Sequence, residues 1–291
     1  MKRAAFLGSA LLMLAAASPA SAADMPLKAP PPVVDPWTWT GVYAGVNGGW
    51  SWGRADTAYA QSSQTIGTIT TTTLGGAVLG VTTIAGPVVT TALADNARMD
   101  GWLGGIQVGH NWQFNQWLVG IEGDFQLTDQ RGGSTFCDIA GCGLGSSVAT
   151  TYFHLDWFGT IRGRAGWIWD NRLLLYATGG LAVGHVSADY DLAVNGLAPN
   201  ASFRSRDIKF GYVVGGGGEY RFTPRWSFKV EYLYMDLGSV DAALSTSATS
   251  PPLIFTVGDQ RLIAVATSTY NALFNTELTD HVVRGGINYR F

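Results

Sequence analysis

The chain has 291 residues, a formal net charge of −3 and only 13% charged residues. This mild acidity, without a basic run in the body of the chain, excludes the electrostatic footprint of a nucleic-acid-binding protein. The 38 glycines and the 12% aromatic residues favour strands over helices. Glycine destabilises helices, whereas aromatic side chains suit a pleated sheet.

The first 22 residues have the features of a secretory signal peptide. Lys2 and Arg3 precede an apolar run over residues 4–17, and small residues at 20–22 provide a cleavage site. The apolar run is too short to span a membrane as a helix. We therefore expect cleavage between Ala22 and Ala23. Residues 23–36 are rich in proline and lack periodicity, which predicts an extended periplasmic leader.

Eight later segments alternate apolar with polar or small residues, as strands do when one face is apolar. The last segment shows the pattern most clearly, because Val283, Ile287 and Phe291 share one face while Arg284 and Arg290 share the other. The eight segments are 41–52, 101–114, 117–128, 153–169, 172–190, 208–222, 226–240 and 281–291.

The connections between these segments alternate in length. Short ones at 115–116, 170–171 and 223–225 have turn-forming residues, and long ones cover 53–100, 129–152, 191–207 and 241–280. Tight periplasmic turns and larger external loops are typical of outer-membrane barrels. The sequence therefore predicts an all-β fold, an eight-stranded antiparallel up-and-down transmembrane β-barrel over residues 37–291 with long extracellular loops.

The longest connection leaves three structures open. A membrane helix within residues 74–94 is conceivable on length, and disorder is another possibility. The many β-branched residues, the internal glycines and Pro87 favour strand hairpins that extend above the barrel rim. Such a loop would provide an adhesive or antigenic surface.

Aromatic residues gather beside the short turns and the ends of the barrel segment, which predicts a ring at one membrane interface. A second group would mark the other interface. The first group is Trp37, Trp39, Phe114, Trp117, Trp167, Trp169, Phe222, Trp226, Tyr289 and Phe291, and the second is Trp50, Trp52, Trp102, Trp157, Tyr212 and Tyr234.

Charged residues inside the segments must point into the barrel, because an Arg or Lys facing lipid at mid-bilayer costs ~2–4 kcal/mol. Both signs occur, and an eight-stranded barrel has room only for side chains. We therefore expect a lumen packed with salt bridges, with a narrow water-filled channel for small solutes as the alternative. The expected lumen charges are Glu122, Asp124, Arg162, Arg164, Glu219, Arg221, Lys229, Glu231, Arg284 and Arg290.

The two cysteines, Cys137 and Cys142, lie in one long connection. An exported chain meets an oxidising compartment, so we expect a small-loop disulfide between them. A metal site is the weaker interpretation, since two thiols without a nearby histidine are half of a tetrahedral site.

Two histidine and carboxylate pairs, His154 with Asp156 and His185 with Asp189, lie near the expected external rim. Neighbouring imidazole and carboxylate groups could perform acid–base catalysis, but a polar rim is the simpler interpretation. The sequence predicts no catalytic set, no metal site and no cofactor.

Several segments resemble a family of small outer-membrane β-barrels of alphaproteobacteria, the RopB-type porin-like immunogenic proteins, related in architecture to the OmpA membrane domain. They are ADMPLKAPPP, WTGVYAGVNGGWSWG, GGIQVGHNWQF, WLVGIEGDF, GTIRGRAGWIW, VEYLYMDLG and HVVRGGINYRF. The resemblance covers both ends and every expected strand, but not the long loops. The long first and last loops and the cysteine pair depart from the family pattern.

The resemblance implies an outer-membrane location and a barrel without an enzymatic centre. It also implies insertion by the barrel-assembly machinery, which reads a C-terminal strand ending in an aromatic residue, here Phe291. An integral barrel of this kind would contact outer-membrane lipid and lipopolysaccharide. The expected role is structural, in envelope integrity, and surface-exposed, as an antigen or adhesin. The sequence does not indicate which partner the loops bind.

Overall fold

The computed structural model describes residues 37–137, 147–194 and 197–291. These described residues belong to one compact unit. The signal peptide over 1–22, its cleavage between Ala22 and Ala23, and the leader over 23–36 lie outside the described residues and stay predictions.

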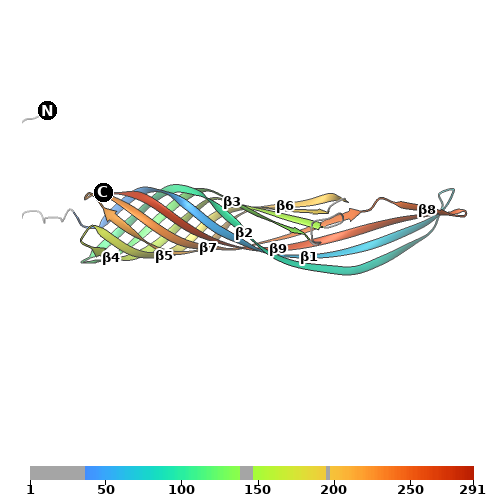
Figure 1. Cartoon of the computed structure of the whole chain (residues 1–291), viewed down its shortest axis with the longest axis horizontal. Helices are drawn as coiled ribbons and strands as arrows, with labels where there is room; N and C mark the ends of the chain where they lie inside the picture. The colour runs from blue at the N-terminus through green and yellow to red at the C-terminus, as the bar shows by residue number, and fades with distance from the viewer. Residues whose placement is uncertain (1–36, 138–146, 195–196) are drawn as a thin grey trace, which may run out of the picture. The chain divides into compact units, whose positions relative to one another are not determined.

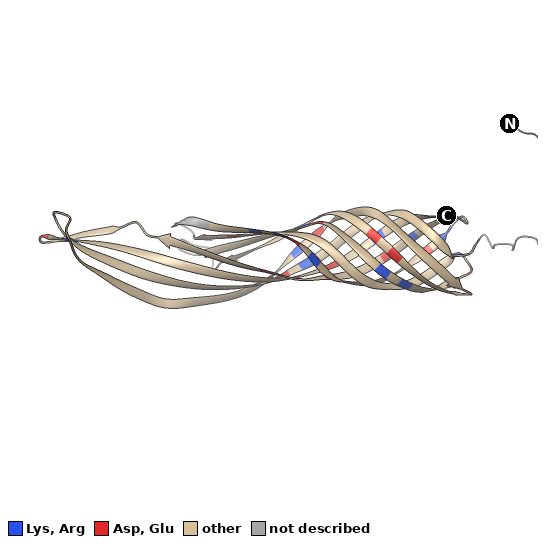
Figure 2. Ribbon diagram, turned by 180° about the vertical axis from the view of Figure 1, so that it is seen from behind, with Lys and Arg blue, Asp and Glu red and all other residues tan. Residues whose placement is uncertain are grey.

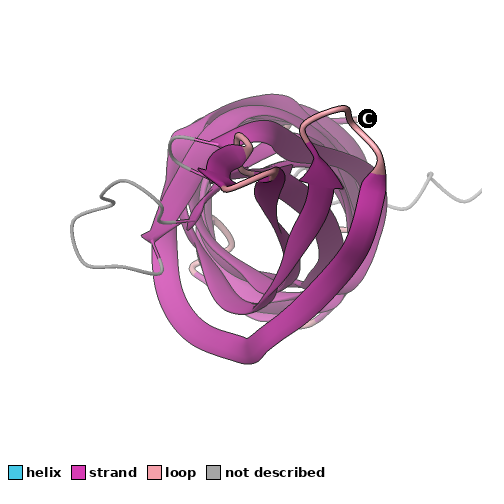
Figure 3. Ribbon diagram, turned by 90° about the vertical axis from the view of Figure 1, so that its right-hand side faces the viewer, coloured by secondary structure: helices cyan, strands magenta, loops and turns pink. Residues whose placement is uncertain are grey.

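The described residues form antiparallel strands that close into a barrel (Figures 1 and 3). Eight strands pair in sequence order, and the ring closes where β9 pairs with β1. The short β8 adds only to the far end of β9. The predicted eight-stranded antiparallel barrel is confirmed. The strands are β1 Gly41–Thr73, β2 Val78–Phe114, β3 Trp117–Cys137, β4 Ser147–Trp169, β5 Leu173–Val194, β6 Leu197–Arg221, β7 Trp226–Thr249, β8 Leu253–Val257 and β9 Gln260–Arg290.

The short connections are tight turns, as predicted. Asp170 and Asn171 have φ values of 49° and 53°, and the Arg172 N–H donates to Trp169 O at 3.3 Å. Positive φ at both central residues is the geometry of a type I′ hairpin turn, whose twist matches that of the flanking strands. Asn115, with φ 56°, makes the turn between β2 and β3.

The long connections differ from the prediction, because most of 53–100, 129–152, 191–207 and 241–280 is strand rather than loop. β1, β2 and β9 contain 33, 37 and 31 residues, far more than the ~9–11 needed to cross a membrane. The reason is the threonine and branched aliphatic content of these segments, which suits a continuous ladder.

The hairpin of β1 and β2 pairs from Gly41 opposite Asn111 to Thr72 opposite Val78. Pro87 lies where the register shifts between Gln64 and Ile66 of the facing strand, as expected for a residue without an N–H. Strand extension is therefore the correct interpretation of residues 78–94, and the helix interpretation is wrong. Among the described residues, no helix is long and apolar enough to cross a membrane.

The ring opens along two seams away from the short turns. Pairing of β2 with β3 ends at Asp100 opposite Arg131, and pairing of β6 with β7 ends at Tyr212 opposite Asp236. Beyond these points β3–β6 form one sheet, and β7, β9, β1 and β2 form another. We call these two extensions the surface sheets. Buried apolar side chains from both sheets make one core cluster, with the Tyr190 ring of β5 4.9 Å from the Phe274 ring of β9.

The outward face of each barrel strand has a band without Asp, Glu, Lys or Arg. On β1 this band runs from Val42, which is 45% exposed, through Trp50 to Trp52, and ends at Arg54. Such an apolar outward band with aromatic borders is the lipid-facing surface of a membrane barrel. Charged residues gather in the barrel part of the chain (Figure 2), and those at the level of this band have buried side chains. The first outward charges beyond the band are Arg54, Asp100, Asp129, Asp156, Asp189, Arg206, Asp236 and Glu277.

The aromatic residues beside the short turns face outward, with Phe114 62%, Trp117 60% and Trp169 66% exposed. Trp39 is an exception, because the sequence places it in this ring whereas the structure buries it completely inside the barrel end. The reason is that residues 37–40 precede the first strand, so strand alternation does not apply to them.

We predict that Gly180 is required for barrel closure. A Cβ at Gly180 would lie 2.0 Å from Ile161 O and 2.7 Å from the Cα of Arg162, whereas one at Gly80 meets no atom within 4 Å. On a denaturing gel of unboiled samples, Gly80→Val should migrate as the compact folded band of the wild type, and Gly180→Val should lose that band. Equal amounts of folded band in the two variants would contradict the described strand packing.

Candidate functional site

The centre of the barrel lumen is an ion-pair cluster around Glu122 on β3. Its Oε1 lies 2.5 Å from Arg162 Nη2 and 2.8 Å from Lys229 Nζ. Its Oε2 accepts a hydrogen bond of 2.6 Å from Tyr43 Oη and lies 3.6 Å from Arg164 Nη1. All five side chains are almost fully buried. The carboxylate therefore holds together residues of β1, β3, β4 and β7.

Asp124 and Glu231 extend this cluster across the barrel. Arg284 Nη2 lies 2.8 Å from Asp124 Oδ2 and 2.6 Å from Glu231 Oε2. Arg162 contacts the same two carboxylates at 2.9 Å and 3.0 Å, and Tyr176 Oη donates to Glu231 at 3.0 Å. Two guanidiniums thus bridge the same pair of carboxylates from β4 and β9.

Glu219 on β6 continues the cluster toward the short turns. Its Oε2 lies 3.2 Å from Arg164 Nη1, and its Oε1 accepts hydrogen bonds from Ser227 Oγ at 2.5 Å and Asn288 Nδ2 at 2.9 Å. Burying an ion costs several kcal/mol unless opposite charges and hydrogen bonds surround it. We call the following charge-balanced set the lumen network: Glu122, Asp124, Glu219 and Glu231 with Arg162, Arg164, Lys229 and Arg284.

The short-turn end of the lumen is closed by Trp39. Its Nε1 donates to Asn171 O at 3.1 Å, and the guanidinium carbons of Arg221 and Arg290 lie 4.8 Å and 5.2 Å from its ring centroid. The two guanidiniums also donate to the main-chain oxygens of Trp37 and Thr38. Cation–π contacts and carbonyl acceptors take the place of carboxylates here. We call Trp39, Arg221 and Arg290 the Trp39 plug.

The structure thus places all ten predicted lumen charges inside the barrel, each at most 9% exposed. It brings eight of them together in the lumen network and the other two, Arg221 and Arg290, around Trp39.

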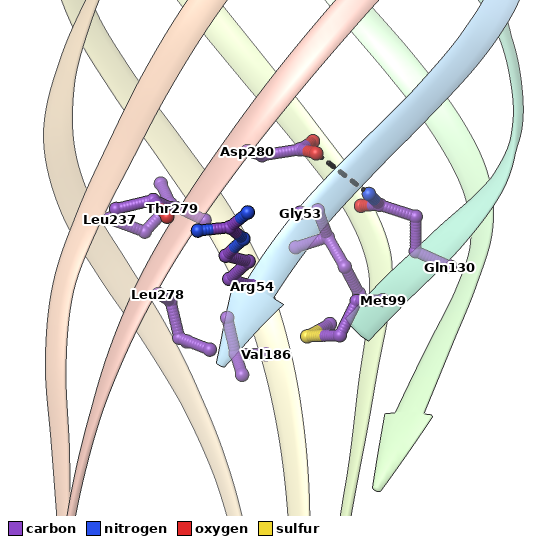
Figure 4. A pocket seen from close by; sticks show the side chains of 10 residues that line it. Gly53, Arg54, Met99, Gln130, Val186, Leu237, Leu278, Thr279 and Asp280 are labelled. Atoms are coloured by element: carbon purple, nitrogen blue, oxygen red, sulfur yellow. Dashed lines mark hydrogen bonds between the residues drawn. The ribbon is translucent and has the colours of Figure 1, made fainter. Parts of the chain in front are cut away.

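The outer half of the lumen is apolar, which the sequence analysis does not predict. A small cavity of about 20 Å³ lies there, lined mainly by Met99, Leu155, Val186, Leu237 and Leu278, and Arg54 also contributes to its lining. At its edge the Gln130 Nε2 donates to Asp280 Oδ1 at 2.9 Å (Figure 4). The apolar core between the surface sheets continues from this level. The interior therefore changes from an ionic layer to an apolar one along the barrel.

Sequence reasoning missed the uncharged partners of the network. Tyr43 alternates with Val42 and Ala44, so its strand position already indicated an inward side chain. Tyr176 gave no such signal, because leucines occupy both faces of β5 around it. Trp39 gave none either, since it precedes the first strand.

The rim histidines lie on the outside of the barrel rather than at its mouth. Asp156 is the first outward charge on β4 beyond the lipid-facing band. It contacts His185 Nδ1 at 2.7 Å, His154 Nε2 at 2.9 Å and Ser187 Oγ at 3.2 Å. Burial acts to raise the pKa of Asp156, but the hydrogen bond from His185 and the charge of His154 hold it below its ordinary value. Asp189 pairs instead with Arg204.

This rim cluster does not have the order of a catalytic triad. In a triad the imidazole lies between the hydroxyl and the carboxylate, whereas Ser187 donates directly to Asp156. Within the residues that the structure describes, no group of three or more His, Cys, Asp or Glu side chains is arranged to hold a metal ion.

Two predicted features stay predictions. Cys137 is the last residue of β3, and Cys142 lies outside the described residues, so their disulfide stays a prediction. Phe291 is 78% exposed, and its N–H donates to Val42 O at 3.1 Å. This placement leaves the terminal ring on the barrel surface, but it does not test a role in assembly.

Comparison with known proteins identifies the family. The family described as "Outer membrane protein beta-barrel domain" matches residues 8–291. The chain belongs to this outer-membrane β-barrel family. It is therefore an outer-membrane protein, as its relatives are. The predicted localisation and the predicted kind of family are confirmed.

Its relatives in this family include the 31 kDa outer-membrane immunogenic protein of Brucella melitensis, which is 29% identical over 259 residues, covering 89% of this chain and 86% of the relative. The 22 kDa outer membrane protein of Rhizobium leguminosarum is 31% identical over 150 residues, covering 52% of this chain and 59% of the relative. Among solved structures, OprG of Pseudomonas aeruginosa is 12% identical with a TM-score of 0.36, covering 87% of this chain and 97% of that chain.

We predict that Glu122→Gln destabilises the barrel by ~3–5 kcal/mol, because Lys229, Arg162 and Arg164 would lose a buried counter-charge. The measurement is the denaturant midpoint of detergent-solubilised barrel, followed by tryptophan fluorescence. The control is Asp129→Asn, which breaks an ion pair of 2.6 Å with an exposed Arg131 and should cost at most ~1 kcal/mol. Similar midpoints for the two variants would show that the lumen network does not stabilise the fold.

Proposed function

We propose that this chain is a structural outer-membrane barrel that does not conduct solutes and that presents its surface sheets outside the cell. The observation that carries the proposal is the filled lumen. The ionic layer, the Trp39 plug below it and the apolar core above it are all made of buried side chains. A barrel filled in this way would be a stable structural component of the outer membrane and would hold the surface sheets outside the cell.

The alternative is a pore for small solutes. A pore of this size needs a continuous path of water past Glu122 and Arg162, and both side chains are at most 2% exposed. Conduction would require the ion pairs of these residues to separate, leaving buried charges without partners. The geometry therefore favours the closed barrel over the pore.

We infer no enzymatic role. The rim cluster around Asp156 is the nearest approach to a catalytic set, and its serine contacts the carboxylate rather than a histidine. The cluster also lies on the outer wall, where Ser187 and His185 are only partly buried. A polar rim that meets the lipid headgroups accounts for these residues.

The surface sheets support a role in display. The hairpin of β1 and β2 carries exposed apolar residues such as Val81, Ile84 and Val88, each 59% exposed, and no charge over residues 57–94. Relatives in Brucella are named outer-membrane immunogenic proteins, which supports surface exposure of the corresponding region here. An antigenic or adhesive surface is the proposed role of this hairpin.

Cysteine labelling of intact cells tests the proposed orientation. A membrane-impermeant maleimide should label Gly80→Cys, at the tip region of the long hairpin, and should not label Gln116→Cys, at a short turn, until the outer membrane is permeabilised. The wild-type chain, whose Cys137 and Cys142 we expect to be paired, gives the background. Labelling of Gln116→Cys alone on intact cells would contradict the proposal.

A further inference from the structure

Two arginines face each other on the outer wall directly beyond the lipid-facing band. Arg54 of β1 is the cross-strand partner of Arg98 of β2, and Thr279 of β9 flanks Arg54 on the other side. Both arginine side chains are exposed. Like charges directly opposite each other on neighbouring strands destabilise a sheet. The repulsion between the two guanidiniums would be relieved by an anion bound from outside the chain.

In the described part of the chain, no carboxylate oxygen lies within 4.0 Å of a guanidinium nitrogen of either arginine. Neighbouring charges at this height behave differently. Arg131 on β3 contacts Asp129 at 2.6 Å, and Arg204 contacts Asp189. Among the described residues, Arg54 and Arg98 are thus two neighbouring positive charges that form no ion pair.

The pair lies at the edge of a recess whose floor is aromatic. The recess has a volume of about 430 Å³, and Trp50, Trp52 and His281 line it together with the two arginines. The rings of Trp52 and His281 stack with centroids 6.0 Å apart. Aromatic rings of this kind sit at the headgroup level of a membrane. Asp100 is the single carboxylate lining the recess within the described residues, so the two arginines outnumber it.

We propose that Arg54 and Arg98 bind the phosphate of a lipid in the external leaflet, with its acyl chains against the band below Trp50 and Trp52. Two guanidiniums match a phosphate group in both charge and hydrogen-bond geometry. The external leaflet is the relevant one because the arginines lie on the side of the surface sheets. This inference rests on the proposed function, in which those sheets lie outside the cell. The partner class is a phosphorylated glycolipid, as in lipopolysaccharide.

The test uses the full-length mature barrel in phosphatidylcholine nanodiscs with added lipid A. Retention of the lipid is measured by native mass spectrometry, with the diphosphorylated lipid compared with its dephosphorylated form. The wild type should prefer the phosphorylated lipid, and Arg54→Gln with Arg98→Gln should weaken binding at least about tenfold, as expected for lost charge-assisted hydrogen bonds. Arg131→Gln is the matched control and should bind as the wild type does.

Every variant is first checked for the compact band of unboiled protein, so that a folding defect is not mistaken for lost binding. Equal binding by the double variant and the wild type would overturn the proposal, as would equal retention of dephosphorylated lipid. Displacement of the lipid by millimolar inorganic phosphate would assign the arginines to a soluble anion instead. These results do not depend on which end of the barrel faces outside, which the labelling of intact cells decides separately.

Discussion

The structure depends on one constraint, that the charged side chains inside a narrow barrel must neutralise or solvate one another without bulk water. Glu122 of β3 meets this constraint for β4 and β7 together, because Arg162, Arg164 and Lys229 all approach its carboxylate. A barrel strand that slipped by one residue would turn these charges toward lipid. The network therefore fixes the register of the barrel as well as filling it.

The same constraint explains why the interior changes character along its length. Within the lipid-facing band, the ionic layer links opposite walls through residues such as Arg284 and Asp124. Beyond the seams the ring divides into two sheets, and these hold together by burying apolar residues such as Tyr190 and Phe274 against each other. Burial of apolar surface between two facing sheets stabilises them, as it does in soluble β-sandwiches. The surface sheets are thus an ordered extension of the barrel.

Much of the barrel fold can be predicted from the sequence, because one face of each membrane strand is apolar and the other is polar or charged. Alternation gave the strand number, the short turns and the inward side of Glu122 and Arg162. It could not give the ends of β1 and β2, since polar and apolar residues mix on both faces of Val78–Met99 once neither face meets lipid. It also could not place Trp39, whose position depends on the guanidiniums of Arg221 and Arg290 from distant parts of the chain.

Planar-bilayer conductance of the refolded wild-type barrel tests the closed lumen most directly. The protein is added to a bilayer in 1 M potassium chloride, with a large water-filled porin as the positive control for insertion. We predict no unitary current steps from the wild type, because the lumen network and the Trp39 plug leave no continuous water path. Steady, ohmic steps that change in size when Arg162 is replaced by Gln would contradict the account and identify the barrel as a pore.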